Sequence, residues 1–162
     1  IGYVPQDIHL MDATIEENIS FSIDSSEINF EKIIEVSKIA ELSDFIQQLP
    51  NQYKTNIGER GIKLSGGQRQ RIGIARALYR DPSVVVLDEA TNSLDSITEE
   101  SVMNAINKLN HKKTIIIIAH RLSSLMLCDI IYMIEDGGIA DKGNYDELIA
   151  KNDKFKKMAK TL

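Results

Sequence analysis

The stretch that decides the fold runs from Leu64 to Asp95 and reads LSGGQRQRIGIARALYRDPSVVVLDEATNSLD. It opens near a glycine pair, continues as a helix, turns at a proline, and ends in an apolar strand followed by two acids and a polar loop. Ser65 and Gln68 have the spacing of a capping box, so we expect the helix to begin directly after Ser65. The unbroken apolar run Val84–Leu87 is typical of a parallel strand buried on both faces. The stretch therefore predicts an α/β fold.

Two parts of this stretch suit phosphate and metal chemistry. Gly66 and Gly67 carry no Cβ, so their amides at a helix N-terminus can approach an anion closely. Asp88 and Glu89 follow the strand at its carboxyl end, where open α/β sheets hold their ligands. Amides for phosphate, with acids for metal and water, are the parts of a nucleotide-hydrolysing site.

The same residues resemble three motifs of ATP-binding cassette (ABC) ATPases. Leu64–Gln68 resembles the family's signature. Val84–Asp88 followed by Glu89 resembles its Walker B strand, and Ser93–Asp95 resembles its D-loop. Each motif alone could arise in a glycine-rich turn or in a strand that ends on acids. Their order and close spacing make the combination specific.

Four further segments fit the same resemblance. Gln6 follows a proline and resembles the Q-loop glutamine, and His120 follows the isoleucine-rich strand Thr114–Ala119 where the family has its switch histidine. Met11–Ile19 resembles the segment that exporters place against the membrane domain. Thr55–Gly61 resembles the exporter loop that contacts the same domain just before the signature. The second of these segments favours export over import.

The resemblance implies a partial P-loop NTPase (RecA-like) three-layer sandwich with a mainly parallel sheet, plus a small helical subdomain. It implies boundaries at residues 1–12 for the Q-loop end of the ATPase core, 13–80 for a helical subdomain ending in the signature helix, and 81–162 for the core with Walker B, D-loop and H-loop. No G-x-x-x-x-G-K pattern followed by Ser or Thr occurs in the chain. We therefore expect a C-terminal fragment that begins at the Q-loop and lacks the P-loop.

The resemblance also implies roles for individual residues. Asp88 and Gln6 would hold Mg²⁺, and Gln6 would also contact ATP. Glu89 would activate the attacking water, and His120 would contact the γ-phosphate. In a head-to-tail dimer of nucleotide-binding domains, Asp95 would link the two sites. The residues expected to contact the nucleotide held by the second domain are Ser65, Gly66, Gly67 and Gln68.

Composition narrows the classes of protein. Of 162 residues, 43% are hydrophobic and 27% charged, which indicates a folded globular chain. The formal net charge of −5 argues against a nucleic-acid partner. A single cysteine, Cys128, fits a reducing cytosolic setting. No apolar run approaches the ~20 residues of a membrane helix, so any membrane part is expected elsewhere.

Outside the motifs, the pattern makes local predictions. Capping boxes are predicted at Thr14 with Glu17 and at Ser96 with Glu99, and a hairpin turn at Asp136–Gly138. The signature helix is expected to keep its arginines on its wetter side. These arginines are Arg69, Arg71, Arg76 and Arg80.

The favoured function is the nucleotide-binding domain of an ABC exporter at the cytoplasmic face of the cell membrane. Its implied partners are a transmembrane domain and a second nucleotide-binding domain. Two alternatives remain open: a soluble ABC ATPase that transports nothing, and a non-catalytic interaction module. The isolated chain is expected to bind ATP poorly, to hydrolyse none, and to be marginally folded or self-associated. The reason is that Thr114–Ala119 would expose an unpaired edge.

Overall fold

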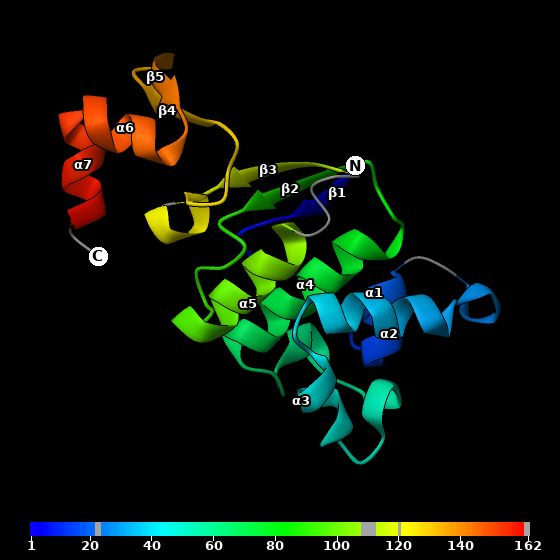
Figure 1. The fold of residues 1–162 in the computed structure, drawn as a ribbon. Helices are drawn as coiled ribbons and strands as arrows, with labels where there is room; N and C mark the ends of the chain where they lie inside the picture. Colours follow the sequence, from blue (N-terminus) through cyan, green and yellow to red (C-terminus); the bar gives the residue numbers. More distant parts are fainter. Residues whose placement is uncertain (22–23, 108–112, 120, 161–162) are drawn as a thin grey trace. The chain divides into compact units, whose positions relative to one another are not determined.

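The computed structural model describes residues 1–21, 24–107, 113–119 and 121–160, which fall into two compact units (Figure 1). The first unit is Ile1–Ile118 and the second is Ala119–Leu162. The strands and α-helices of the first unit are β1 Gly2–Val4, α1 Ile15–Ser20, α2 Phe30–Ile39, α3 Ser43–Gln47, α4 Gly66–Tyr79, β2 Val84–Asp88, α5 Ser96–Asn107 and β3 Thr114–Ile118. Its short 3₁₀ helices are Ser25–Glu27, Gln52–Lys54 and Glu59–Gly61.

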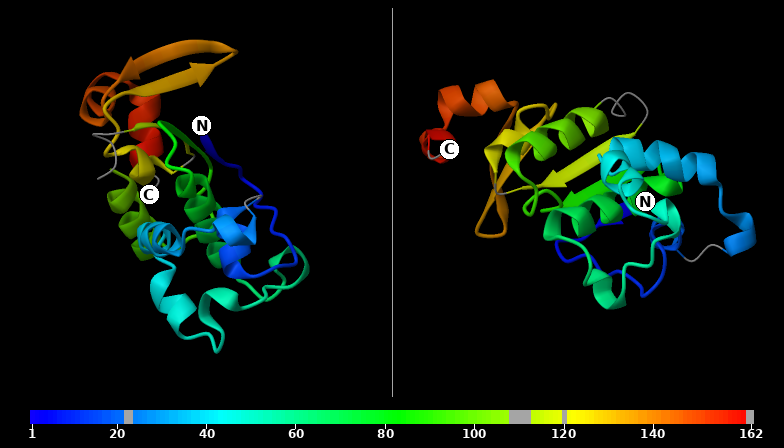
Figure 2. Two further views of the ribbon diagram at one scale, coloured as in Figure 1. Left: turned by 90° about the vertical axis from the view of Figure 1, so that its right-hand side faces the viewer. Right: turned by 90° about the horizontal axis from the view of Figure 1, so that it is seen from below.

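The first unit is built on a parallel sheet with the strand order β1-β2-β3. In β1, Val4 lies opposite Leu87 of β2, and Asp88 of β2 lies opposite Ile118 of β3. Figures 1 and 2 show α4 and α5 along one face of this sheet. The predicted α/β class with a parallel sheet and a helical part is confirmed.

The two faces of the sheet differ in burial. Val85 and Leu87 are buried on the face that the helices cover. On the opposite face, Tyr3 is 55%, Ile116 48% and Ile118 50% exposed. The prediction of burial on both faces was therefore wrong, because in the described part of the first unit the helices lie on one face only. Within that part β3 pairs only with β2, so its outer edge is open, as expected from the sequence.

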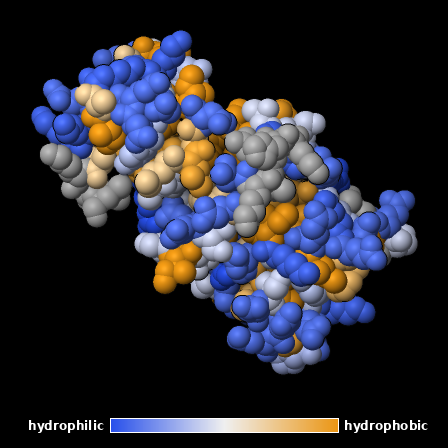
Figure 3. All heavy atoms as spheres, viewed as in Figure 1, coloured by the Kyte–Doolittle hydropathy of each residue, from blue (hydrophilic) through white to orange (hydrophobic). Residues whose placement is uncertain are grey.

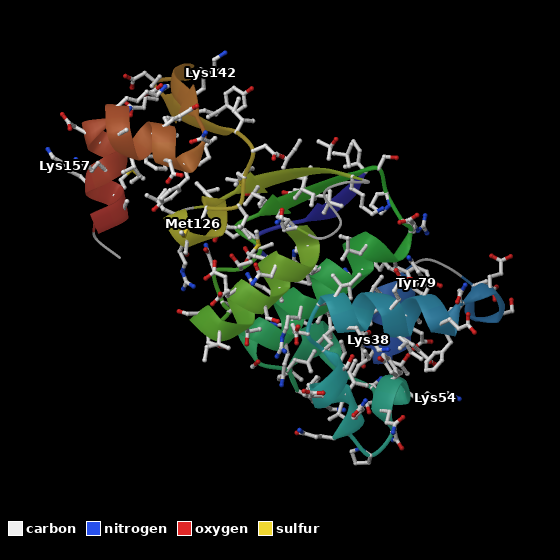
Figure 4. All side chains as sticks on the ribbon, in the orientation of Figure 1. Lys38, Lys54, Tyr79, Met126, Lys142 and Lys157 are labelled. Carbon is white, nitrogen blue, oxygen red and sulfur yellow. The ribbon has the colours of Figure 1, made fainter. Side chains whose placement is uncertain are left out.

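The helices α1 and α2 pack against α4 and form the helical part of the core. The hydroxyl of Tyr79, at the end of α4, accepts a hydrogen bond of 2.8 Å from the amide of Asn29 (Figure 4). Glu41 has φ +55 and separates α2 from α3. In the view of Figure 3, hydrophilic residues predominate over α2 and α3, whereas Ile33, Val36 and Ile46 are buried and Phe30 is 45% exposed.

The prediction that Arg76 lies on the wetter side of α4 was wrong, because this side chain is half-buried. Its guanidinium donates to the carbonyls of Asn18 and His9, both at 2.8 Å, and to Oδ1 of Asn18 at 3.1 Å. It also lies 4.6 Å from the centre of the Phe21 ring. Burial lowers the pKa of Arg76 from its usual value. Three carbonyl and amide oxygens satisfy this charge, which is the usual condition for burying one.

The helix caps predicted at Thr14 and Ser96 have different outcomes in the structure. Thr14 caps α1, and its capping box with Glu17 is confirmed. The capping box predicted at Ser96 was wrong, because Ser96 is already the first residue of α5. Asp95 occupies the cap instead, and its carboxylate accepts from the amide of Thr98 at 3.0 Å and from its hydroxyl at 2.8 Å.

The described residues of the second unit form a 3₁₀ helix, a β-hairpin and two α-helices. Its hairpin turn holds Asp136 at φ +49 and Gly137 at φ +77, the left-handed pair of a type I′ turn, so the predicted turn is confirmed. The elements are the 3₁₀ helix Leu122–Leu125, β4 Ile131–Glu135, β5 Gly138–Gly143, α6 Tyr145–Lys151 and α7 Asp153–Lys160. Its buried core is formed by Leu122, Ile131, Leu148 and Phe155. Within the described residues of both units, no helix has the length and apolar character needed to cross a membrane.

Candidate functional site

Five polar side chains meet at the carboxyl end of the sheet, and we call them the acid cluster: Tyr3, Gln6, Asp88, Glu89 and Asn92. The phenol of Tyr3 donates to Oδ2 of Asp88 at 2.9 Å. The amide of Gln6 donates from Nε2 to Oε2 of Glu89 at 2.9 Å. Nδ2 of Asn92 donates to the same Oε2 of Glu89 at 2.6 Å. Each of the two acids is thus bound by at least one neutral donor.

Parallel pairing explains how distant segments reach this cluster. Val4 is the last residue of β1 and lies opposite Leu87, near the end of β2. The carboxyl ends of parallel strands meet at the same edge of a sheet, which is where such sheets hold ligands. Gln6 and Glu89, 83 positions apart in the sequence, therefore lie side by side.

Glu89 adopts an unusual backbone conformation. Its φ of +49 lies in the left-handed region, which costs a non-glycine residue roughly 1–3 kcal/mol. The amide of Glu89 donates to the carbonyl of Ile118 at 2.9 Å, so the residue is still tied to β3 as the chain leaves β2. Backbone strain of this kind is common at active sites and ligand-binding sites, where the surrounding structure holds the strained residue in place.

The hydrogen bond between Tyr3 and Asp88 has an electrostatic consequence. It raises the pKa of the Tyr3 phenol above its usual value, first through the hydrogen bond itself and then through desolvation and the nearby charge. The phenol therefore stays protonated and continues to donate to Asp88 at neutral pH. Sequence reasoning missed Tyr3, although its place in β1, three residues before Gln6, was a usable signal.

The turn Leu64–Gln68, which we call the signature turn, begins α4. Oγ of Ser65 accepts from the amide of Gln68 at 3.2 Å, and Oε1 of Gln68 accepts from the amide of Ser65 at 2.8 Å. The capping box predicted here is confirmed. The first amides of a helix have no partner within it, so those of Gly66 and Gly67 are suited to an anion.

The signature glycines also have a packing role. A Cβ on Gly67 would lie 3.1 Å from the carbonyl oxygen of Ser93, and one on Gly66 would lie 3.4 Å from Cβ of Ser93. The loop that follows β2 therefore passes directly over the signature turn. Gly67 has the tighter contact of the two, so it has a structural reason to lack a side chain in addition to any contact with a ligand.

Gln70 joins α4 to that loop and was missed by sequence reasoning. It is only 4% exposed, its Oε1 accepts from the amide of Ser93 at 2.9 Å, and its Nε2 donates to the carbonyl of Glu89 at 3.5 Å. The only sequence signal was a polar residue on an otherwise apolar helix face. Gln70 thus connects the helix of the signature turn to the acid cluster.

The structure brings some of the expected site residues together and separates others. Gln6, Asp88 and Glu89 meet in the acid cluster, whereas Ser65, Gly66, Gly67 and Gln68 form the signature turn. Asp95 caps α5, and its pKa is lowered mainly by the amide and the hydroxyl of Thr98. The predicted γ-phosphate contact, His120, lies outside the described residues. Among the described residues, no three or more His, Cys, Asp or Glu side chains are grouped as metal ligands.

The two segments expected to face a membrane domain also meet. Thr14 forms an antiparallel bridge with Asn56. The amide of Ile15 donates to the carbonyl of Thr55, and the amide of Ile57 to that of Ala13, both at 3.1 Å. Met11–Ile19 and Thr55–Gly61 are therefore neighbours in the first unit.

Known proteins resemble this chain over nearly its whole length. The family model described as ABC transporter matches residues 1–92. ABC transporter B family member 18 of Arabidopsis thaliana is 46% identical over 95% of this chain and 13% of its own length. The multidrug resistance ABC transporter ATP-binding and permease protein of Lactococcus lactis is 43% identical over 97% of this chain and 26% of its own length.

A solved structure gives the same result. The structure of a bacterial Atm1-family ABC exporter with ATP bound is 36% identical, with a TM-score of 0.91 over 99% of this chain and 28% of that one. The chain thus spans between 13% and 28% of the length of the two relatives and the solved structure named here. Motifs, family model and fold agree, and the chain belongs to the ABC transporter family, matching the nucleotide-binding part of its exporters.

Proposed function

We propose that the protein carrying this chain hydrolyses ATP and couples the reaction to export of a substrate across a membrane. The observation that carries this proposal is the hydrogen bond between Gln6 and Glu89 at the carboxyl end of the sheet. It joins Gln6, the residue expected to contact Mg²⁺ and ATP, to Glu89, the residue expected to activate water. If the hydrogen bond between Gln6 and Glu89 had only a structural role, it would not need a second acid, Asp88, beside it.

Glu89 acts as the general base in this proposal. Its carboxylate takes a proton from the attacking water, a role worth roughly 10²–10⁴-fold in rate. Gln6 and Asn92 orient that carboxylate through Oε2. His120 would donate a hydrogen bond or positive charge to the γ-phosphate as negative charge develops there.

Mg²⁺ fits the donors of the acid cluster. This ion keeps several waters and usually binds one or two carboxylates together with substrate phosphates, so it needs no dense cluster of protein ligands. Asp88 supplies a carboxylate, and Gln6, which donates from Nε2, retains its carbonyl oxygen as a ligand atom. When bound, Mg²⁺ would neutralise charge on the phosphates. The protein's part is to keep Asp88 oriented through Tyr3.

A second nucleotide-binding domain would complete the site. The amides of Gly66 and Gly67, with the hydroxyl of Ser65 and the side chain of Gln68, would face the γ-phosphate of ATP bound mainly by the partner. The phosphate-binding loop would come from parts of the longer protein outside residues 1–162. Asp95 would connect the two sites of the head-to-tail dimer. The proximity of the loop at Ser93 to the signature turn supports such a connection.

The other proposed partner is a transmembrane domain, which would hold this part of the protein at the cytoplasmic face of a membrane. The pairing of Met11–Ile19 with Thr55–Gly61 supports a common contact surface for it. We further propose residues 1–12, 13–80 and 81–162 as the functional divisions: Q-loop, helical subdomain, and core with Walker B, D-loop and H-loop.

The test is ATP turnover and substrate movement by the complete polypeptide in lipid vesicles. Mg²⁺-dependent hydrolysis, accompanied by ATP-dependent accumulation of a substrate, would support both halves of the proposal. Hydrolysis by a complete polypeptide without hydrophobic spans would instead identify an ATPase that transports nothing. Absence of hydrolysis with Mg²⁺ present would contradict the proposal as a whole.

A further inference from the structure

The carboxylate of Glu89 is bound by a residue of its own loop. Nδ2 of Asn92 donates to Oε2 at 2.6 Å, which is shorter than the 2.9 Å bond from Gln6 to the same oxygen. A neutral amide that donates to a carboxylate fixes its direction without neutralising its charge. The two amides have different origins, because Gln6 follows β1 whereas Asn92 lies three residues beyond Glu89.

A tight turn places Asn92 over the acid. The amide of Asn92 donates to the carbonyl of Glu89 at 3.2 Å, and Glu89 itself has φ +49. Left-handed backbone at Glu89 turns the chain sharply at the end of β2, so a side chain three residues later can reach back to the carboxylate. Asn92 and Glu89 therefore belong to the same turn of the chain.

Buried contacts on both sides of the turn hold it in place. Gln70 accepts from the amide of Ser93 at 2.9 Å. The hydroxyl of Thr91 donates to Oε1 of Glu99 at 2.9 Å, and both of these residues are buried. The backbone of the loop is thus fixed by Gln70 and Glu99, so it does not rely on the side chain of Asn92.

We propose that Asn92 is a positioning residue that holds the Glu89 carboxylate in the direction needed to activate water. This inference rests on the proposed function. Gln6 belongs to another segment and is expected to contact the metal, whereas Asn92 stays with Glu89 whatever Gln6 binds. An amide suits this role because it donates without charge, while an acid here would repel Glu89 and a serine would be shorter.

The test compares variants of the complete polypeptide in steady-state and single-turnover ATP hydrolysis. Asn92→Ala should lower kcat about 10- to 100-fold, the range expected for a misplaced catalytic group, while KM for ATP changes less than about twofold. Asn92→Ser should recover part of the loss, and the isosteric Asn92→Asp should lose at least as much as Asn92→Ala. Asn51→Ala is the matched control, because Asn51 is exposed, makes no side-chain cap, and should leave the rate unchanged.

A double-mutant cycle separates positioning from a structural role. If Asn92 acts through Glu89, Asn92→Ala should cause no further loss of single-turnover rate in a Glu89→Gln background. Equal losses in both backgrounds would overturn the inference. If Asn92→Ala does not fold, Asn92→Asp decides, since it keeps the volume: a wild-type rate would overturn the inference.

Failure of the proposed function gives a different pattern. A wild-type protein that does not hydrolyse ATP would refute that function. An active wild type with an inactive Glu89→Gln and a fully active Asn92→Ala would refute only the role of Asn92. Melting curves of each variant identify losses that come from unfolding.

Discussion

The acid cluster and the signature turn use their polar groups in opposite ways. In the acid cluster, side chains bind one another, and the oxygens of Asp88 and Glu89 are oriented by amides and a phenol. In the signature turn, the oxygens of the Ser65 and Gln68 side chains are engaged in starting α4, and backbone amides are the main groups left for a ligand. The chemistry of the acid cluster should therefore depend on the identity of its side chains, and that of the signature turn mainly on the absence of side chains at Gly66 and Gly67.

The largest expected effect is at Glu89. Glu89→Gln in the complete protein should keep ATP binding and lower turnover by roughly 10²–10⁴-fold, because the amide preserves shape and removes the base. Single-turnover hydrolysis and nucleotide titration measure the two properties separately. Near-normal hydrolysis by this variant would contradict the assignment of Glu89 as the base. It would also contradict the expectation that the acid cluster depends on the identity of its side chains.

The next effect concerns the signature turn. Gly67→Asp should abolish ATP-driven dimerisation while each monomer still binds nucleotide, since the new carboxylate blocks and repels phosphate. Gly67→Ala is the control for packing, because its Cβ would already lie 3.1 Å from the Ser93 carbonyl. Dimerisation can be followed by analytical ultracentrifugation and monomer binding by calorimetry. An equal loss of monomer binding would show that the turn acts within its own subunit.

A third prediction concerns the elements that carry the two regions. The signature turn begins a helix packed by α1 and α2, whereas the acid cluster lies on a sheet with one exposed face. The isolated chain 1–162 should therefore self-associate or be marginally folded, bind ATP poorly and hydrolyse none. Ile118→Lys on the exposed face should reduce light scattering, whereas Ile117→Lys on the covered face should unfold the first unit. A monodisperse wild-type monomer with micromolar ATP affinity would contradict this expectation.

The smallest effect is expected at Tyr3. Tyr3→Phe removes one neutral donor from Asp88 and should lower turnover by at most about tenfold. Because the pKa of Tyr3 is raised above 10.0, its stabilising hydrogen bond is complete below pH 10 and is lost as the pH rises through the raised pKa. Alkaline titration of phenol absorbance should show a late-titrating group that is absent from Tyr3→Phe. No difference between the two titrations would mean that Asp88 is not held by this phenol.

Local features of this protein could be predicted from the sequence because they depend on neighbours in the chain. The capping boxes at Ser65 and Thr14 and the turn at Asp136–Gly138 are confirmed, since each needs only residues a few positions apart. The same rule failed at Ser96, where two caps were compatible with the spacing. Asp95 is the cap in a loop whose backbone is bound by Gln70 of α4 and Glu99 of α5, contacts that the capping rule does not consider.

The family could be predicted from the sequence alone, because its motifs are short, ordered and chemically specific, and the same motifs propose Asp88 and Glu89 as the site acids. Which neutral groups bind those acids is visible only in the folded chain. Tyr3 and Gln6 reach Asp88 and Glu89 through the parallel pairing of β1 with β2, which no local pattern encodes. The open face of the sheet was equally beyond the sequence, since an isoleucine has the same character whether or not another segment covers it.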